Sequence, residues 1–422
     1  MKLLISFCNT ELISTLSKKK ISPLACLDTS SNTLYWVRLP IWADSNGVTG
    51  LTADKKCVYV AYQRPLSKGT VIVVLDKSTL KVRSEYELTA VEDVHSLAIR
   101  DSFLYLVSTG TDTVYKISLK NGLLDTASLQ RVWSPKYSKG TTDTHHINGI
   151  CNGSEGLIIS AFGKKSGRDK STATQGYVYN LSKQEFAVNN ISHPHSIIES
   201  NGELVYAESA SQTIYSSKRG SLKFTVGYIR GLCMTENDYL VIGRSSGRRV
   251  SRSSGRVNNI MDKGRLLQSC SITIFKLMDD KKFNDLYSFL SNLQKEQFFN
   301  YRFNDYFREI YDVISLDGKI HPTNWISKTT IDRDIDISLI SLDTMLQKAK
   351  REDLLTLYKH VNYVFSLKAN ATYDLYEARR DVLQMEKELA FEKENVAKLK
   401  ARLKRIEESK LYKVYTKLND LI

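Results

Sequence analysis

The sixteen residues "DVHSLAIRDSFLYLVS" (93–108) contain two short apolar runs that are separated by a polar turn. The first run opens with a small residue in front of Leu or Ile. The same arrangement returns four more times, in "GVTGLTADKKCVYVAY" (47–62), "HHINGICNGSEGLIIS" (145–160), "HPHSIIESNGELVYAE" (193–208) and "YIRGLCMTENDYLVIG" (228–243). The small residues recur 46, 53, 47 and 35 positions apart. Repeats of this length that consist of short strands are typical of a β-propeller.

Further strands complete each repeat. A third strand is visible in "GTVIVVLD" (69–76), and outer strands are visible in "EFAVNNI" (185–191) and around 308–316. Residues 1–40 fit as the later strands of one more blade, and the ring would close where these strands meet the segment near 310–316. We therefore predict a mainly β fold, with a β-propeller of about six blades over residues 1–320. Five blades is the alternative, because the unit formed by residues 1–40 lacks an obvious innermost strand.

The pattern becomes helical in other parts of the chain. Residues 279–308 indicate a helical insertion, and residues 321–370 a helical linker region. Residues 371–422 are predicted to form an α-helical coiled coil with a basic amphipathic tail. Heptad spacing from 375 to 406 indicates a seam for a homo-oligomer. This seam consists of Leu375, Ala378, Val382, Met385, Leu389, Val396, Leu399, Leu403 and Ile406. The tail at 407–422 mixes Lys with Tyr and Leu, which favours weak contact with an acidic membrane surface.

The net charge of +14 is concentrated in a few segments. Residues 160–275 hold sixteen Lys and Arg against eight Asp and Glu, with basic clusters at 163–170 and 243–256. Localised charge favours an anionic partner. Nucleic acid is not favoured, because regularly spaced aromatic residues are missing from these loops. The six cysteines form no CxxC pair, and no apolar run is long enough to span a membrane, so we expect a cytoplasmic protein.

The candidate site follows from the repeat. In a propeller, the start of each innermost strand lies at one mouth of the central channel. The residues directly before the small residues are Thr49, His95, Asn148, His195 and Arg230. His146 lies two residues before Asn148 and should therefore lie on the same side of its strand, whereas His145 should point away. The candidate catalytic residues are His95, His146, His195 and Arg230.

Two kinds of chemistry remain open at this mouth. Three neutral imidazoles, from His95, His146 and His195, could hold a divalent metal as cofactor. The same groups could instead bind a carboxylate or phosphate beside Arg230. We expect further ligand-binding residues from the same strands and from the neighbouring basic loops, namely Asp93, Asn148, Ser196, Glu208, Ser209, Arg244, Lys164, Lys165 and Arg168.

Several blocks resemble a bacterial family of uncharacterised propeller proteins, the DUF4915-like group. The blocks are "DVHSLAI", "HHINGI", "HPHSIIESNGELVYAES", "GYIRGLCMTENDYLVIGRSSGRR" and "EIYDVISL". The resemblance covers roughly residues 40–320 and implies a propeller without a settled activity. It points to matching positions at His95, His146, Asn148, His195, Ser196, Arg230 and Arg244. The loop at 163–176 departs from the family pattern in lacking a tryptophan, which leaves the identity of the ligand open.

The C-terminal sequence "LKRIEESKLYKVYTKLNDLI" resembles coiled-coil tails of surface-polysaccharide glycosyltransferases and methyltransferases. We therefore expect a cytoplasmic protein, peripheral at the inner membrane, that binds an anionic sugar or nucleotide-sugar in glycan assembly. If it is an enzyme, a lyase, hydrolase or glycan-transfer step would use histidine acid–base or metal chemistry. The alternative is a non-catalytic scaffold that oligomerises through its coiled coil and recruits protein partners.

Overall fold

Apolar residues that occupy both faces of the inner strands decide how the sheets are buried. Every residue of β5 (Cys57–Gln63) is buried, whereas the outer strand β7 (Val82–Leu88) alternates between exposed and partly buried positions. A strand that is covered on both faces must lie between two other layers. The sheets therefore pack face to face, and the outermost strand β7 is far more exposed than the inner strand β5.

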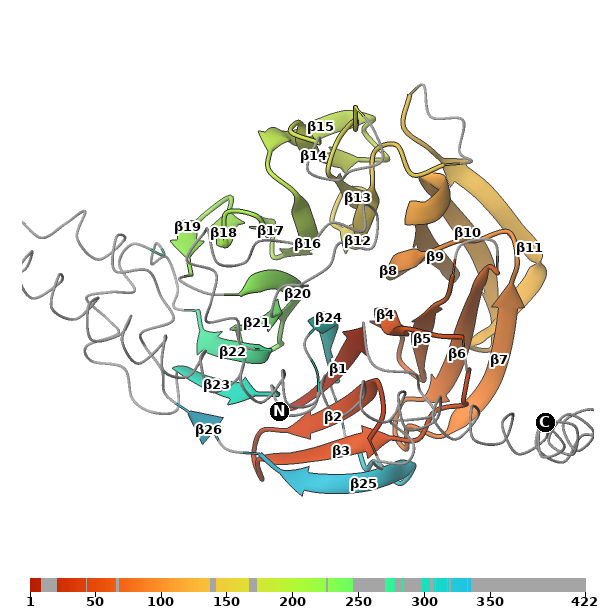
Figure 1. Cartoon of the computed structure of the whole chain (residues 1–422), viewed down its shortest axis with the longest axis vertical. Helices are drawn as coiled ribbons and strands as arrows, with labels where there is room; N and C mark the ends of the chain where they lie inside the picture. Colours follow the sequence, from red (N-terminus) through yellow and green to blue (C-terminus); the bar gives the residue numbers. More distant parts are fainter. Residues whose placement is uncertain are drawn as a thin grey trace, which may run out of the picture. The chain divides into compact units, whose positions relative to one another are not determined.

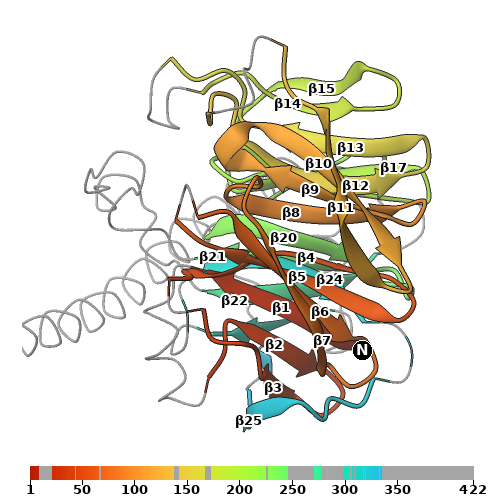
Figure 2. The same cartoon turned by 90° about the vertical axis from the view of Figure 1, so that its right-hand side faces the viewer.

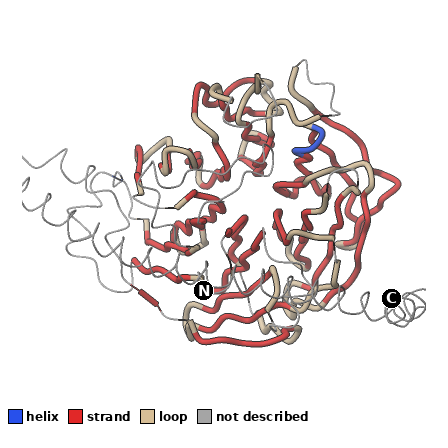
Figure 3. The backbone as a smooth tube through the Cα atoms, in the orientation of Figure 1, coloured by secondary structure: helices blue, strands red, loops and turns tan. Residues whose placement is uncertain are grey.

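The computed structural model describes residues 1–8, 21–42, 44–65, 68–136, 142–166, 173–224, 227–245, 270–277, 283, 298–303, 307, 309–316, 318, 320–331 and 333–334. All of them belong to one compact unit, Met1–Leu354. The second unit, Leu355–Ile422, lies outside the described residues, as do the predicted coiled coil and tail. Strands dominate the described part, which contains one short 3-10 helix, η1 (Thr109–Thr111) (Figure 3).

The described strands form six antiparallel groups around a common centre (Figure 1). From the innermost strand outward, the first group is β24 (Glu309–Ser315), β1 (Lys2–Cys8), β2 (Leu24–Asp28), β3 (Thr33–Val37) and β25 (Trp325–Thr330). The second is β4 (Gly47–Ala53), β5, β6 (Thr70–Asp76) and β7, and the third is β8 (Val94–Arg100), β9 (Phe103–Ser108), β10 (Thr113–Lys120) and β11 (Leu123–Trp133). One residue pair, Cys8 with Gly47, joins the first two groups into a nine-stranded sheet.

The remaining groups repeat this order. The fourth is β12 (Ile147–Gly153), β13 (Gly156–Ala161), β14 (Gly176–Asn180) and β15 (Glu185–Ile191). The fifth is β16 (Pro194–Ser200), β17 (Glu203–Glu208), β18 (Thr213–Ser216) and β19 (Gly220–Lys223). The sixth is β20 (Tyr228–Met234), β21 (Tyr239–Ser245), β22 (Ser271–Lys276), β23 (Phe298–Arg302) and β26 (Arg333–Asp334). Neighbouring innermost strands run side by side (Figure 2).

The hydrophobic core consists of six clusters, and each cluster fills the space between two neighbouring groups. In the cluster between the first and sixth groups, the ring of Phe7 stacks on Phe307 at 4.3 Å and contacts Trp36 at 5.9 Å. Six groups with six shared interfaces close into a ring. The mainly β fold is confirmed, and its antiparallel sheets of four or more strands are consistent with a β-propeller.

The closure of the ring confirms one expectation and corrects three. Strand β1 pairs with β24, so residues 309–315 do meet the N-terminal strands. The same segment is an innermost strand and not the expected outer one, because Ile310 and Val313 are buried between two groups. The outer strand of the sixth group is β23, which lies inside the expected helical insertion at 279–308. Strand β25 lies inside the expected helical linker and extends the first group, so strands continue beyond residue 320.

No helix among the described residues is long and apolar enough to cross a membrane.

Candidate functional site

Each innermost strand contains one β-bulge against its neighbour in the group. The pairing shifts by one residue within β4, β8, β12, β16, β20 and β24. A bulge leaves one residue outside the ladder and re-aims its side chain. The bulges lie at equivalent places, and their residues are Thr49, His95, Asn148, His195, Arg230 and Tyr311. Five of these six positions follow directly from the sequence repeat.

In five of the six groups the residue after the bulge residue is Gly or Ser, because the next innermost strand comes close. A Cβ atom on Gly149 would lie 2.5 Å from the Ser160 hydroxyl oxygen and 2.9 Å from the His195 carbonyl oxygen. Where this position is polar, its side chain accepts a hydrogen bond from the backbone of the next group. The Ser196 hydroxyl accepts one from the Gly231 N–H at 2.7 Å, and the Asp312 carboxylate accepts one from the Leu51 N–H at 3.0 Å.

Seven side chains at this level touch one another in a closed circuit, which we call the seven-residue ring. Going round, neighbouring ring centroids or guanidinium groups are 4.6 to 5.2 Å apart. The members, in order, are His146, His95, Tyr311, Arg230, Tyr228, His195 and Phe162. They come from five of the six groups, so the circuit runs around the common centre.

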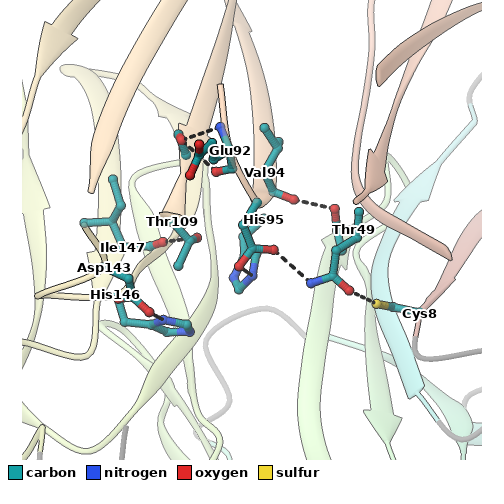
Figure 4. Close-up of polar contacts among 12 residues, drawn as sticks. Cys8, Thr49, Glu92, Val94, His95, Thr109, Asp143, His146 and Ile147 are labelled. Atoms are coloured by element: carbon teal, nitrogen blue, oxygen red, sulfur yellow. Dashed lines mark hydrogen bonds and ion pairs between the residues drawn. The ribbon is translucent and has the colours of Figure 1, made fainter. Parts of the chain in front are cut away.

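Acidic or hydroxyl partners orient the three histidines of the seven-residue ring. Asp93 Oδ2 lies 3.3 Å from His95 Nε2. Asp143 Oδ2 lies 3.0 Å from His146 Nδ1, and Figure 4 shows this contact. The Ser209 hydroxyl lies 2.9 Å from His195 Nδ1 and donates a hydrogen bond to the Ile229 carbonyl of the next group. A carboxylate that contacts one imidazole nitrogen fixes the orientation of the ring.

His146 reaches the seven-residue ring from a strained backbone position. Its φ is +54°, in the left-handed region, and it stands directly before β12. Asp93 before β8 and His193 before β16 have the same conformation, at +48° and +49°. Non-glycine residues rarely adopt this conformation. The three equivalent residues show that one local geometry is repeated at the start of successive innermost strands.

Arg230 is the only cationic member of the seven-residue ring, and its charge is compensated. Its guanidinium lies between Tyr228 and Tyr311, 5.0 and 4.8 Å from their centroids, and its Nη1 is 3.3 Å from Glu309 Oε2. Both charged side chains are buried. Because the two opposite charges lie close together, the ion pair has almost no net charge. Arg230 therefore offers hydrogen-bond donors more than a net positive charge.

A cavity of about 310 Å³ begins at the seven-residue ring and runs along the innermost strands. His95, Asn148, His195 and Tyr311 form one end of it, and Ala53, Ile99, Asn152, Ile198 and Ile314 line the other end. The side chain of Asn148 is only 5% exposed. Its Oδ1 accepts a hydrogen bond from Ser160, whereas its Nδ2 has no hydrogen-bond partner among the described residues. This buried amide donor lies at the wall of the cavity.

Asp312 is the one Asp, Glu, Lys or Arg among the described residues that line the cavity. Burial raises the pKa of Asp312 from 3.8 to about 7. The Leu51 and Val313 N–H groups donate hydrogen bonds to the carboxylate and act in the opposite direction, but desolvation prevails. The carboxyl group can therefore change its charge near neutral pH.

The structure brings together only part of the predicted site. His95, Asn148, Ser196 and His195 line the cavity, while His146 and Arg230 belong to the seven-residue ring without lining the cavity. The three-histidine metal site is not formed: no group of three or more His, Cys, Asp or Glu side chains among the described residues is placed to hold a metal ion. The Phe162 ring explains this, because it contacts both His146 and His195 at 4.6 and 4.9 Å and so stands between them.

The other predicted ligand-binding residues have structural roles or lie elsewhere. Lys165 pairs with Asp143 at 2.7 Å, and Lys164 is exposed outside the cavity. The Glu208 carboxylate accepts hydrogen bonds from the Ser192 N–H and the Ser211 hydroxyl. Arg244 is fully buried, where it donates to Asn300 and contacts Phe224. Arg168 lies outside the described residues.

His145 packs against Tyr177, away from the seven-residue ring, as expected. The sequence reasoning missed Tyr311 and Asp312, which occupy the sixth bulge and the position after it. Their block, "EIYDVISL", follows the same residue pattern as the other repeats, except that Asp312 stands where the others have Gly or Ser. Phe162 and Tyr228 were also missed, since neither stands at the repeated position.

The fold and the cavity define a propeller-like protein with a polar cavity at the centre of its strand ring. The chain belongs to the DUF4915 family, a domain of unknown function, whose sequence pattern matches residues 48–324. A chain of the nidogen/laminin complex has a similar structure. The match covers 74% of this chain and 97% of the other, with 10% sequence identity and a TM-score of 0.46. A candidate 6-phosphogluconolactonase from Bacteroides uniformis is also similar. The match covers 78% of this chain and 98% of the other, with 12% sequence identity and a TM-score of 0.40. A comparison with curated proteins finds no match.

Proposed function

We propose that this protein binds a sugar in its central cavity. The observation that carries the proposal is the buried amide donor of Asn148, which has no hydrogen-bond partner among the described residues and stands at the wall of a polar cavity. A buried donor without an acceptor costs free energy, which a ligand hydroxyl could recover. The hydroxyls of Ser96 and Ser196 and the His95 and His195 rings line the same space and suit a ligand with many hydroxyl groups.

The size of the cavity favours a single sugar unit. Its volume of about 310 Å³ is at the lower end of small-molecule sites. Of the two ligands expected from the sequence, a nucleotide-sugar would place only its sugar inside. The basic segments that favoured an anionic ligand, 163–170 and 243–256, contribute no residue to the described cavity wall. Sugar recognition is therefore the part of the expected function that the cavity supports best.

We also interpret the six strand groups as the blades of a six-bladed propeller, on the basis of their six shared interfaces. An acid–base step on the bound sugar would use His95 and His195, because these two candidate catalytic residues line the cavity. We place the binding in bacterial surface-glycan assembly, in the cytoplasm or peripherally at the inner membrane. This setting rests on the resemblance of the C-terminal tail.

Titration calorimetry with glucose, glucosamine, N-acetylglucosamine and glucuronate tests the proposal. We expect at least one of these sugars to bind, and Asn148→Ala to weaken that binding about tenfold, the effect of one lost hydrogen bond to a buried donor. The control is Asn189→Ala, since Asn189 is exposed on the outermost strand β15 of the same group. The proposal is wrong if none of the four sugars binds, or if the two variants bind alike.

A further inference from the structure

The position that follows the bulge residue can be compared across the six groups. It is Gly or Ser in five of them, at Gly50, Ser96, Gly149, Ser196 and Gly231, and it is Asp312 in the sixth. Ser196 shows that a hydroxyl is enough to accept the backbone hydrogen bond from the next group. A carboxylate is therefore not needed for the packing of the innermost strands, although burying it is costly.

Asp312 also lines the cavity. Each of its two carboxylate oxygens accepts one backbone N–H, from Leu51 and Val313. Each carboxylate oxygen can accept a second hydrogen bond. No lysine or arginine among the described residues lines the cavity with it, and the nearest ring cation, Arg230, is already paired with Glu309. The cavity thus presents an acidic group without a basic partner in its own wall.

The end of the cavity away from the seven-residue ring is acidic as well. The turns that leave the innermost strands there carry Asp54, Asp101, Glu155, Glu236 and Asp238, against Lys55 and Lys56. Asp101 pairs with Arg100 and Glu155 with Lys183, so the acidic excess at this end rests on the other three carboxylates. Carboxylates around an opening raise the local concentration of cations. The carboxylates at the opening and Asp312 in the cavity therefore both favour a positively charged ligand.

Building on the proposed sugar binding, we infer that the sugar carries a free amino group and that its ammonium pairs with the Asp312 carboxylate. This changes the expected ligand from an anionic sugar to an amino sugar. Asn148, His95 and His195, which line the cavity one residue nearer the seven-residue ring, then bind the hydroxyl groups. An ammonium donates up to three hydrogen bonds, and charge-assisted bonds to a carboxylate are about twice as strong as neutral ones. The positive charge of the ammonium would also lower the pKa of the Asp312 carboxyl group from its raised value.

The test compares glucosamine with glucose and N-acetylglucosamine on wild type, Asp312→Ser and Asp101→Ser. Asp312→Ser installs the residue that two other groups have at this position, so the hydrogen bond to the Leu51 N–H can be kept. Asp101→Ser removes the same charge from the exposed turn. We expect wild type to bind glucosamine at least about tenfold more tightly than the other two sugars. Asp312→Ser should bind glucosamine and glucose with similar affinity, whereas Asp101→Ser should keep the preference.

Three outcomes would overturn the inference. Equal affinity of wild type for glucosamine and glucose would leave sugar binding intact and refute the ammonium pair. A preference that survives in Asp312→Ser would refute the role of this carboxylate. Methylamine, which carries the ammonium without the sugar, tests whether the positive charge alone is enough for binding. If methylamine competes for the cavity as strongly as glucosamine does, the site is a simple cation site. If no sugar binds at all, the proposed function fails first.

Discussion

Replacing Asp312 by Ser should change how the stability of this protein depends on pH. The pKa of Asp312 is raised from 3.8 to about 7 in the folded protein, so between these values the folded state binds one more proton than the unfolded state. The free energy of unfolding therefore contains a contribution that is fully present at low pH and is lost as the pH rises through 7. The sign is opposite to that of a carboxylate in a salt bridge.

The magnitude follows from the pKa. Each pH unit in this window corresponds to about 1.4 kcal/mol, so the two units between pH 5 and pH 7 amount to about 3 kcal/mol. Asp312 is only partly buried as a residue, and solvent screening therefore reduces the effect to about 1.5 kcal/mol. Between pH 5 and pH 8, wild type should lose this much stability relative to Asp312→Ser.

Urea denaturation followed by tryptophan fluorescence at pH 5, 6, 7 and 8 measures the effect. Only the change with pH of the difference between the two proteins matters, because a packing cost of the substitution is the same at every pH. Titration of the histidines is common to both proteins and largely cancels. The matched control is Ser196→Ala, which removes an uncharged hydrogen bond at the equivalent position and should shift stability equally at all pH values. Parallel pH curves for wild type and Asp312→Ser would refute the raised pKa.

Three further predictions concern packing, charge and the C-terminal region. Gly149→Ala should destabilise the protein by about 1 to 3 kcal/mol, because its Cβ would overlap the Ser160 hydroxyl and the His195 carbonyl; an unchanged melting temperature would contradict this. Arg230→Met should lower the free energy of unfolding by about 3 to 5 kcal/mol, because it leaves Glu309 buried without its cation. The double variant Arg230→Met/Glu309→Gln should recover most of this loss. A double variant as unstable as the single one would contradict the ion-pair explanation. Light scattering should show self-association of the full chain and none for a chain ending at residue 370, and a monomer in both cases would exclude an oligomer through 375–406.

The sequence predicted the fold well because the repeat is enforced by contact. The residue after each bulge must be small wherever the next innermost strand lies against it, as the space around Gly149 shows. That requirement marks five bulge positions without any structural knowledge. The sixth escaped because Asp312 replaces the small residue and because the strands that follow β24 in its group, β1 to β3, lie at the opposite end of the chain. A repeat pattern shows which segments are strands, but not which distant strand each one pairs with.

The chemistry of the site was less predictable than its position. Three histidines at repeated positions suggested a metal, yet Phe162, which follows β13 and stands at no repeated position, separates two of them. The net charge suggested an anionic ligand, but charge counted along the sequence does not show which groups face a cavity. Asp312 is the one Asp, Glu, Lys or Arg in the described cavity wall.

The pairing of β1 with β24 has a consequence for synthesis of the chain on the ribosome. The Ser6 hydroxyl donates a hydrogen bond to the Asp312 carbonyl, a contact between residues 306 positions apart. Until β24 emerges, β1 has no partner on its inner side and offers an unpaired edge, which is a site for pairing with other chains. Contacts of such long sequence separation also slow folding. Strands β1 to β3, which are made before β24, should therefore be the part of the ring that most needs protection by chaperones during synthesis.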